Sequence, residues 1–163
     1  MLPERKFKVD MNNPFFERER FKHEFYRIDK VFIPSTDIDI EFEIEYKGTW
    51  LCTQKLENKI RGVCLKFPIE YEYFKKILKT KLYKGEKIAL LRHFIPIGAS
   101  NLYAIVDLYT KANLGLVLVT VQFRDEEQYK NFVVPDWFGV EVTGDSRYDD
   151  INLAMKPYNT WEV

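Results

Sequence analysis

The sequence VPDWFGVEVTGDSRY, from Val134 to Tyr148, is the stretch that decides the fold. Pro135 ends any helix that arrives from the preceding residues. The aromatic side chains of Trp137, Phe138 and Tyr148 are suited to anchoring an irregular segment against a sheet. We therefore expect residues 134–148 to form a closing segment that packs on the rest of the fold, and we keep this name for it below.

Upstream of the closing segment, several stretches alternate between apolar and polar residues with period two. Such alternation places successive side chains on opposite faces of a strand. The stretches are residues 2–9, 38–46, 49–55, 61–67, 87–95, 103–109 and 115–123. This many strands predict a barrel or a large curved sheet.

Helical spacing is less frequent in the sequence. Residues 68–82 place apolar side chains on one face and lysines on the other, which predicts an amphipathic helix. Asp125 is a suitable cap for a second helix that ends before Pro135. Asn13 followed by Pro14 has the form of a cap and a first-turn proline, so we expect a third helix over residues 14–25.

Length and composition favour one globular domain over residues 1–163. Apolar residues make up 46% of the chain and aromatic residues 16%, which is enough for a substantial core. Lys and Arg together equal Asp and Glu at 25 each, so no overall field would collect bulk nucleic acid or an anionic membrane surface. Any anion site must therefore be local.

The cysteines and the start of the chain bear on location. Cys52 and Cys64 both fall in strand-like stretches, and no charged and then apolar leader precedes the first strand. No apolar run approaches the roughly 20 residues that a membrane helix needs. We expect a cytoplasmic protein with free thiols.

Short motifs also occur in a fixed order over residues 2–155. They are Glu4-Arg5-Lys6-Phe7, Leu51-Cys52-Thr53-Gln54-Lys55, Arg61 at a strand start, Arg92, Asp107 and Glu141-Val142-Thr143. In this order they resemble the CYTH domain, also called the triphosphate tunnel fold. The resemblance implies an α+β fold whose eight antiparallel strands form a closed or nearly closed barrel with a few flanking helices.

In that family the tunnel holds a triphosphate or polyphosphate between basic residues, and carboxylates hold one or two divalent metals. Hydrolysis of a phosphoanhydride is the usual chemistry, and a few members cyclise ATP. Carried over position by position, the resemblance implies these roles: phosphate binding by Lys6, Lys55, Arg61 and Arg92, binding of Mg²⁺ or Mn²⁺ by Glu4 and Asp107, and a family match at Glu141.

The chain also departs from the family pattern. Apolar residues stand at positions where the family carries charge, and we expect their side chains to point inward: Leu2, Phe42, Ile44, Val63, Leu65 and Leu90. Thr120 and Gln122 replace a late glutamate pair. Either part of the tunnel has become dry core, or an apolar wall accepts an organic moiety beside the phosphates.

Three glutamates lie within one predicted strand. Glu41, Glu43 and Glu45 alternate with Phe42 and Ile44, which favours an acidic stripe on the outer face that could meet a basic protein partner. A shift of register by one residue would instead turn these carboxylates into the tunnel, where they would supply the missing metal ligands.

These observations lead to one main hypothesis and two alternatives. The main hypothesis is a divergent CYTH-like protein that binds a phosphate-rich ligand, either a nucleoside triphosphate or polyphosphate, with weak or no hydrolysis. The first alternative is an active, metal-dependent triphosphatase. The second is a protein-interaction module on a degenerate tunnel scaffold.

Overall fold

The computed structural model describes residues 3–98 and 101–161, which form eight strands, four α-helices and three short 3-10 helices. The strands are β1 Glu4–Lys8, β2 Phe25–Ile33, β3 Ile38–Tyr46, β4 Trp50–Asn58, β5 Val63–Pro68, β6 Lys84–Ile97, β7 Leu102–Tyr109 and β8 Val117–Gln122. The helices are α1 Pro14–Glu19, α2 Tyr71–Thr80, α3 Glu126–Asn131, α4 Asp150–Met155, η1 Lys111–Asn113, η2 Ser146–Tyr148 and η3 Tyr158–Thr160.

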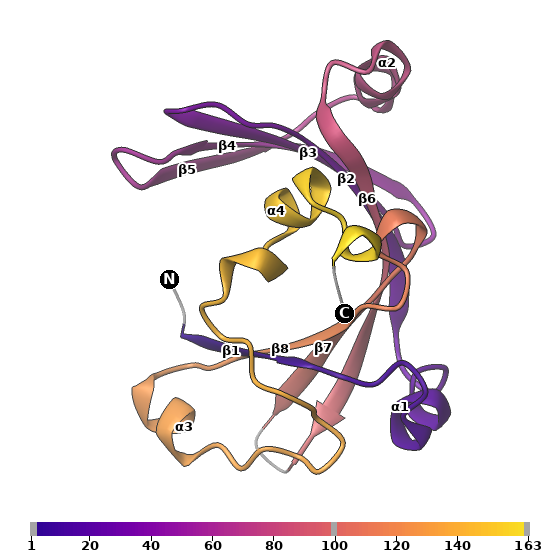
Figure 1. Cartoon of the computed structure of the whole chain (residues 1–163), viewed down its shortest axis with the longest axis vertical. Helices are drawn as coiled ribbons and strands as arrows, with labels where there is room; N and C mark the ends of the chain where they lie inside the picture. The colour runs from indigo at the N-terminus through magenta and orange to yellow at the C-terminus, as the bar shows by residue number, and fades with distance from the viewer. Residues whose placement is uncertain (1–2, 99–100, 162–163) are drawn as a thin grey trace.

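All eight strands belong to one antiparallel sheet with the order β1-β8-β7-β6-β2-β3-β4-β5. The sheet curves strongly, so that α4 and the C-terminal segment lie on its concave side (Figure 1). Among the described residues, no ladder joins the edge strands β1 and β5. The predicted α+β fold with eight antiparallel strands is confirmed, in its nearly closed form.

Strand β2 lies at the centre of the sheet, between β6 and β3, and no alternating stretch predicted it. Its segment from Ile28 to Phe32 is buried at every position, because both faces of the sheet are covered there. A strand buried on both faces has no polar face and therefore no alternation. The helix expected over residues 14–25 ends at Glu19, so its last residues belong to the turn before β2 and to β2 itself.

Helix α2 covers the convex face of β3 and β4. Phe42 and Ile44 of β3 pack there with Phe74 and Ile77 of the helix, and Cys52 of β4 completes the cluster. The expectation that Phe42 and Ile44 point into the tunnel is therefore wrong. Their apolar side chains point outward because an amphipathic helix, and not solvent, covers that face.

The concave face holds a second apolar cluster. Leu90 of β6 and Ile28 of β2 are buried beneath Leu153 and Ala154 of α4. Part of the interior is therefore dry core, as the inward direction of Leu90 predicted. The remaining concave surface borders the cavity described below.

The closing segment runs along β1. The Lys8 amide donates to the Val140 carbonyl at 2.8 Å, the Gly139 amide donates to the Lys8 carbonyl at 2.7 Å, and the Val142 amide donates to the Lys6 carbonyl at 2.8 Å. Phe138 packs on Phe7 with ring centroids 5.0 Å apart. The predicted anchoring by Phe138 is thus confirmed, and the segment covers the outer edge of β1. Within the described ranges, no helix has the length and apolar character needed to span a membrane.

Candidate functional site

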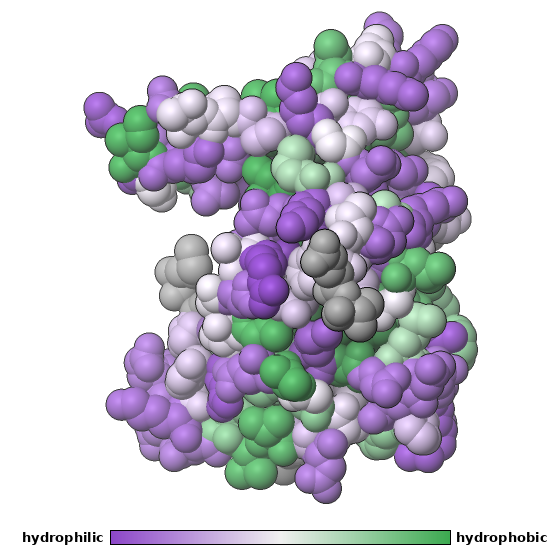
Figure 2. All heavy atoms as spheres, in the orientation of Figure 1, coloured by the Kyte–Doolittle hydropathy of each residue, from purple (hydrophilic) through white to green (hydrophobic). Residues whose placement is uncertain are grey.

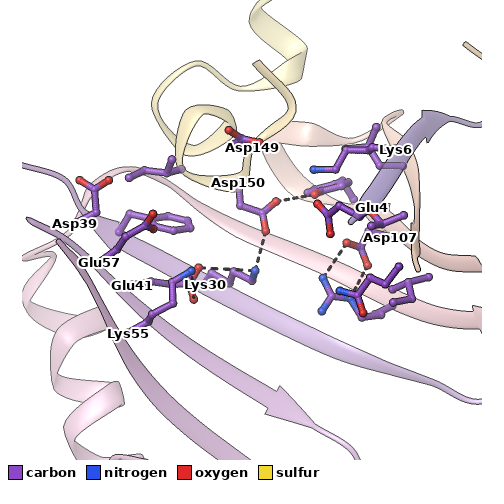
Figure 3. A pocket seen from close by; sticks show the side chains of 18 residues that line it. Glu4, Lys6, Lys30, Asp39, Glu41, Lys55, Glu57, Asp107, Asp149 and Asp150 are labelled. Atoms are coloured by element: carbon purple, nitrogen blue, oxygen red, sulfur yellow. Dashed lines mark hydrogen bonds and ion pairs between the residues drawn. The ribbon is translucent and has the colours of Figure 1, made fainter. Parts of the chain in front are cut away.

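A cavity of about 640 Å³ lies between the concave face of the sheet and the start of α4. Figure 3 shows side chains pointing into it from both arms of the sheet and from α4. Its lining consists of Glu4, Lys6, Lys30, Phe32, Asp39, Glu41, Lys55, Glu57, Arg92, Ile105, Asp107, Tyr109, Leu118, Thr120, Gln122, Asp149, Asp150 and Ile151. This cavity is the candidate site.

One wall comes from β1, β8, β7 and β6. Cross-strand pairing places Lys6 opposite Thr120, and Arg92 opposite Asp107. Directly opposite residues of antiparallel strands point to the same face. Period-two alternation therefore correctly predicted the inward direction of Lys6, Arg92 and Asp107.

Arg92 and Asp107 form a two-pronged ion pair within this wall. Arg92 Nε donates to Asp107 Oδ1 at 2.7 Å, and Arg92 Nη2 donates to Asp107 Oδ2 at 2.9 Å. Burial alone would lower the pKa of the Arg92 guanidinium, but the hydrogen bond and charge of Asp107 outweigh burial and raise it. Arg92 is therefore a permanent cation, held in a fixed orientation at the cavity.

The opposite wall comes from β2, β3 and β4. Asp39 and Glu41 of β3, together with Lys55 and Glu57 of β4, line the cavity. Glu41 and Glu43 are both 8% exposed. The expected acidic stripe on the outer face is therefore wrong, because Glu41 and Glu43 point inward, and Glu41 is the one of the three glutamates that lines the cavity.

Lys30 of β2 organises the carboxylates of this wall. Its Nζ atom lies 2.8 Å from Asp150 Oδ2, 3.8 Å from Glu41 Oε1 and 3.7 Å from Glu43 Oε1. Burial alone would lower the pKa of Lys30, but the three carboxylates outweigh burial and raise it. A charged lysine inside the fold is thus compensated by the surrounding anions.

Asp150 connects the sheet to α4. Its second oxygen, Oδ1, accepts a hydrogen bond from the Tyr109 hydroxyl at 2.6 Å. Burial would raise the pKa of Asp150, but Lys30 and the two hydrogen bonds hold it below its usual value. Burial raises the pKa of Tyr109 well above its usual value, and the charge of Asp150 adds to this effect. Asp150 is therefore ionised and Tyr109 is neutral at physiological pH.

The residues singled out from the sequence divide into two groups. Those in the cavity lining are Glu4, Lys6, Lys55, Arg92 and Asp107, as well as Thr120 and Gln122. Arg61 is outside the cavity, because β4 extends to Asn58 and leaves Arg61 exposed in the turn before β5.

Two further expectations of inward-pointing residues are also wrong, and Leu2 lies outside the described residues. Val63 and Leu65 of β5 are more than half exposed and do not line the cavity. Lys66 reaches Glu43 at 3.9 Å on the concave side. Leu65 precedes Lys66 and Val63 lies two residues before Leu65, so alternation directs both side chains to the other face.

Glu141 has a structural position outside the cavity. Arg5 Nε donates to Glu141 Oε2 at 2.9 Å and Arg5 Nη2 donates to Glu141 Oε1 at 2.6 Å. Thr143 Oγ1 also donates to Glu141 Oε2, at 2.7 Å. The ion pair fastens the closing segment to the outer side of β1.

Carboxylates outnumber cationic side chains in the cavity lining by seven to four. Oxygen donors of this kind suit Mg²⁺ and Mn²⁺. Within residues 3–98 and 101–161, however, no three His, Cys, Asp or Glu side chains are grouped closely enough to hold a metal ion by themselves. The donor set therefore fits an ion held by one or two carboxylates, with ligand oxygens and water completing its coordination.

Lys30 and Asp150 were missed as site residues. Lys30 lies in the strand that has no alternation, so its direction had no signal in the sequence. Asp150 lies only two residues after the closing segment, and a helix-starting acid at the surface is the ordinary interpretation of such a position.

Comparisons with known proteins place this geometry in context. The chain is 42% identical over 57 residues to an inorganic triphosphatase of Acetivibrio thermocellus, a match that spans 35% of each chain. It is 27% identical over 117 residues to an inorganic triphosphatase of Nitrosomonas europaea, covering 71% of this chain and 76% of the relative. No protein-family profile matches the chain.

Solved structures show the same fold at low sequence identity. The structure of an inorganic triphosphatase superposes with a TM-score of 0.71 at 23% identity, covering 95% of both chains. A Hippeastrum protein described as an adenylyl cyclase candidate with a dominant triphosphatase activity superposes with a TM-score of 0.59 at 8% identity. It covers 80% of this chain and 83% of the other. These two likenesses establish the arrangement of the strands.

Proposed function

The chain is a CYTH, or triphosphate tunnel, domain, and on this premise we propose that its cavity binds inorganic triphosphate and hydrolyses a phosphoanhydride bond with a divalent metal ion. The observation that carries the proposal is the meeting of cations and carboxylates from opposite arms of the sheet in one cavity. A polyanion needs the cations, and its metal counterions need the carboxylates.

Three cations are assigned to the phosphates. Lys6 approaches from one wall and Lys55 approaches from the other (Figure 3). Arg92 lies opposite Asp107 in the wall of Lys6, so a short chain of phosphates can be held between the three cations. Arg92 can present its guanidinium in a fixed plane because Asp107 holds it, and a fixed guanidinium suits phosphate oxygens. Lys55 lies 3.9 Å from Glu41, at the outer limit of an ion pair, and can exchange that carboxylate for phosphate.

Glu4 and Asp107 are assigned to the metal, Mg²⁺ or Mn²⁺. Both line the wall that also carries Lys6 and Arg92. When bound, such an ion neutralises charge on the phosphate oxygens during displacement. The residues of the chain orient the phosphates and keep the cavity partly closed to bulk water by means of α4.

A second candidate is binding with weak or no hydrolysis, including binding of a nucleoside triphosphate or of polyphosphate. One observation favours it: both oxygens of Asp107 already accept hydrogen bonds from Arg92. A carboxylate used in this way has less capacity left for a metal ion. The apolar side chains of Phe32, Ile105 and Leu118 in the lining offer contact area for an organic moiety.

Calorimetry and phosphate release together separate these functions. Titration with triphosphate, ATP and short polyphosphate, each with and without Mg²⁺ or Mn²⁺, measures binding. Release of orthophosphate from the same ligands measures turnover. We expect triphosphate to bind and to be hydrolysed only with the metal, and Glu4→Gln to abolish release while Glu72→Gln on exposed α2 leaves it unchanged.

The outcomes are distinct. Binding without release in any metal would leave the second candidate, and failure of every phosphate compound to bind would overturn both. Equal release by Glu4→Gln and the parent protein would remove Glu4 from the assignment.

A further inference from the structure

Strand β5 is an uncovered edge of the sheet. Every residue from Val63 to Pro68 is exposed, and β5 pairs only with β4 within the described residues. The hairpin of β4 and β5 stands clear of the lower part of the molecule, with a notch beneath it (Figures 1 and 2). Exposed edges of this kind accept another strand unless charge or proline protects them. In β5 the Lys66 side chain is directed to Glu43 at 3.9 Å on the concave side, and Pro68 is the last residue, so the stretch before Pro68 stays open.

The other edge of the sheet is already occupied. The closing segment donates to and accepts from the backbone of β1 at Lys6 and Lys8, and Phe7 forms a bridge with Glu141. Strand β5 therefore cannot complete the barrel by pairing with β1 of its own chain. Among residues 3–98 and 101–161, no other strand is left to cover β5.

The free backbone groups of β5 can be identified. The Ile69 amide donates to the Cys52 carbonyl of β4 at 2.9 Å. Since backbone groups alternate in direction along a strand, Val63, Leu65 and Phe67 also face β4. Cys64 and Lys66 then present their amides and carbonyls to the open edge, and Pro68, which has no amide, ends the usable stretch.

We propose that β5 pairs with β5 of a second copy of this chain, antiparallel about a two-fold axis at Leu65. In this register Cys64 of one copy lies opposite Lys66 of the other, and each such pair exchanges both backbone hydrogen bonds. Lys66 never lies opposite Lys66, so like charges do not meet across the strands.

The side chains on the convex face support the same register. Val63 is 51% exposed, Leu65 is 58% exposed and Phe67 is 39% exposed. The axis at Leu65 brings Val63 of one copy opposite Phe67 of the other, which is a favourable pair of a β-branched and an aromatic side chain. Each of these three exposed apolar side chains thus gains an apolar neighbour across the two strands.

Charge is complementary just beyond the strand ends. Arg61 precedes β5 and Glu70 follows it, and both are exposed. Neither makes an ion pair with the part of its own chain that the structure describes. An antiparallel arrangement brings the Arg61 end of one copy beside the Glu70 end of the other, twice by symmetry. A second copy of the chain carries a positive charge at one end of β5 and a negative charge at the other, so it fits this edge in the antiparallel direction.

Sedimentation velocity of the full chain over a wide concentration range tests the proposal. We expect a reversible dimer and no larger species, because a two-fold interface closes on itself. Lys66→Pro removes an amide from the open edge without removing one that faces β4, so it should yield monomers that keep the circular dichroism spectrum of the parent.

A charge exchange tests the register. Arg61→Glu alone and Glu70→Arg alone should each weaken the dimer by about tenfold, because each places like charges together at both symmetric contacts. The double variant R61E/E70R should return the dissociation constant to near that of the parent. A monomer at every concentration, growth beyond a dimer, or a dimer indifferent to these variants would overturn the proposal.

Discussion

Lys30 Nζ lies 2.8 Å from Asp150 Oδ2, and this contact joins the central strand β2 to the first residue of α4. Both side chains are largely buried, at 11% and 17% exposed. The pair is both a wall of the cavity and the attachment of the helix that fills the concave side of the sheet. The same two residues therefore connect the stability of the fold to the shape of the cavity.

Replacement of Asp150 by Asn should destabilise the fold by about 1–3 kcal/mol, because Lys30 then keeps only the more distant Glu41 and Glu43. Urea unfolding measures this loss. Lys30→Met should also destabilise, and the double variant should lose less than the sum of the two, with a coupling of at least about 1 kcal/mol. Asp149→Asn, at the exposed neighbouring position, is the matched control. If the losses in unfolding free energy of the two single variants simply added up in the double variant, Lys30 and Asp150 would not stabilise each other.

Lys55→Gln should weaken triphosphate binding by about tenfold, since it removes a charge-assisted contact from one wall of the cavity. The control is Lys79→Gln, which removes the same charge from exposed α2 on the convex side. Calorimetry at one fixed salt concentration gives both dissociation constants. If the two variants lost affinity equally, the effect would come from net charge and not from the cavity.

The stability of the fold should fall as the pH drops below about 6.5, the ordinary pKa of histidine. Burial lowers the pKa of His93, whose ring is fully buried between Phe16 and Phe25, with Nδ1 3.1 Å from the Arg20 carbonyl. The unfolded chain binds a proton in this pH range and the folded chain does not, so stability rises with pH.

Urea unfolding at several pH values between about 5 and 8, where histidine ordinarily titrates, measures how the unfolding free energy changes with pH. His93→Gln should flatten this dependence, whereas replacement of His23, which is 33% exposed on the surface, should not. A slope that is unchanged in His93→Gln would assign the pH dependence to other groups.

Gly139→Ala should loosen the closing segment. A Cβ atom at this position would lie 2.7 Å from the Lys8 carbonyl oxygen, so the backbone of β1 or of the segment would have to shift. We expect a loss of about 1–3 kcal/mol in unfolding free energy. Val140→Ala, at an adjacent side chain that is 71% exposed, should cost little. Comparable losses in both variants would show that the close approach to Lys8 is not the cause.

Alternation in the sequence correctly predicted the strands that supply most of the cavity. It gave the inward direction of Lys6, Lys55 and Arg92 because each lies in a strand with one polar and one apolar face. The aromatic residues of the closing segment also predicted that it packs on the sheet, and Phe138 and Tyr148 are indeed buried.

Strand β3 shows why the same pattern failed elsewhere. The alternation predicts that its apolar residues Phe42 and Ile44 face the interior, which is the usual rule for a sheet with one solvated face. Here the interior is polar and α2 covers the exterior, so the rule is reversed. Alternation identifies two faces, but it does not identify which of them a helix covers.

The prediction that Arg61 starts a strand and lies in the cavity is wrong for a different reason. Its place in a strand depended on where the hairpin turns, and β4 continues past Lys55 to Asn58. Residues 59–62 are then left to make the turn. Turn boundaries depend on pairing across strands, which a single sequence does not contain.

Strand β1 has neighbours that come late in the chain, β8 on one side and the closing segment on the other. On the ribosome, Glu4–Lys8 therefore emerges more than a hundred residues before either neighbour exists. Until then the backbone of β1 has neither of its final partners. The cavity can therefore close only after β8 and the closing segment have been made, and a product that stopped before them would carry Lys6 and Lys55 without the surrounding walls.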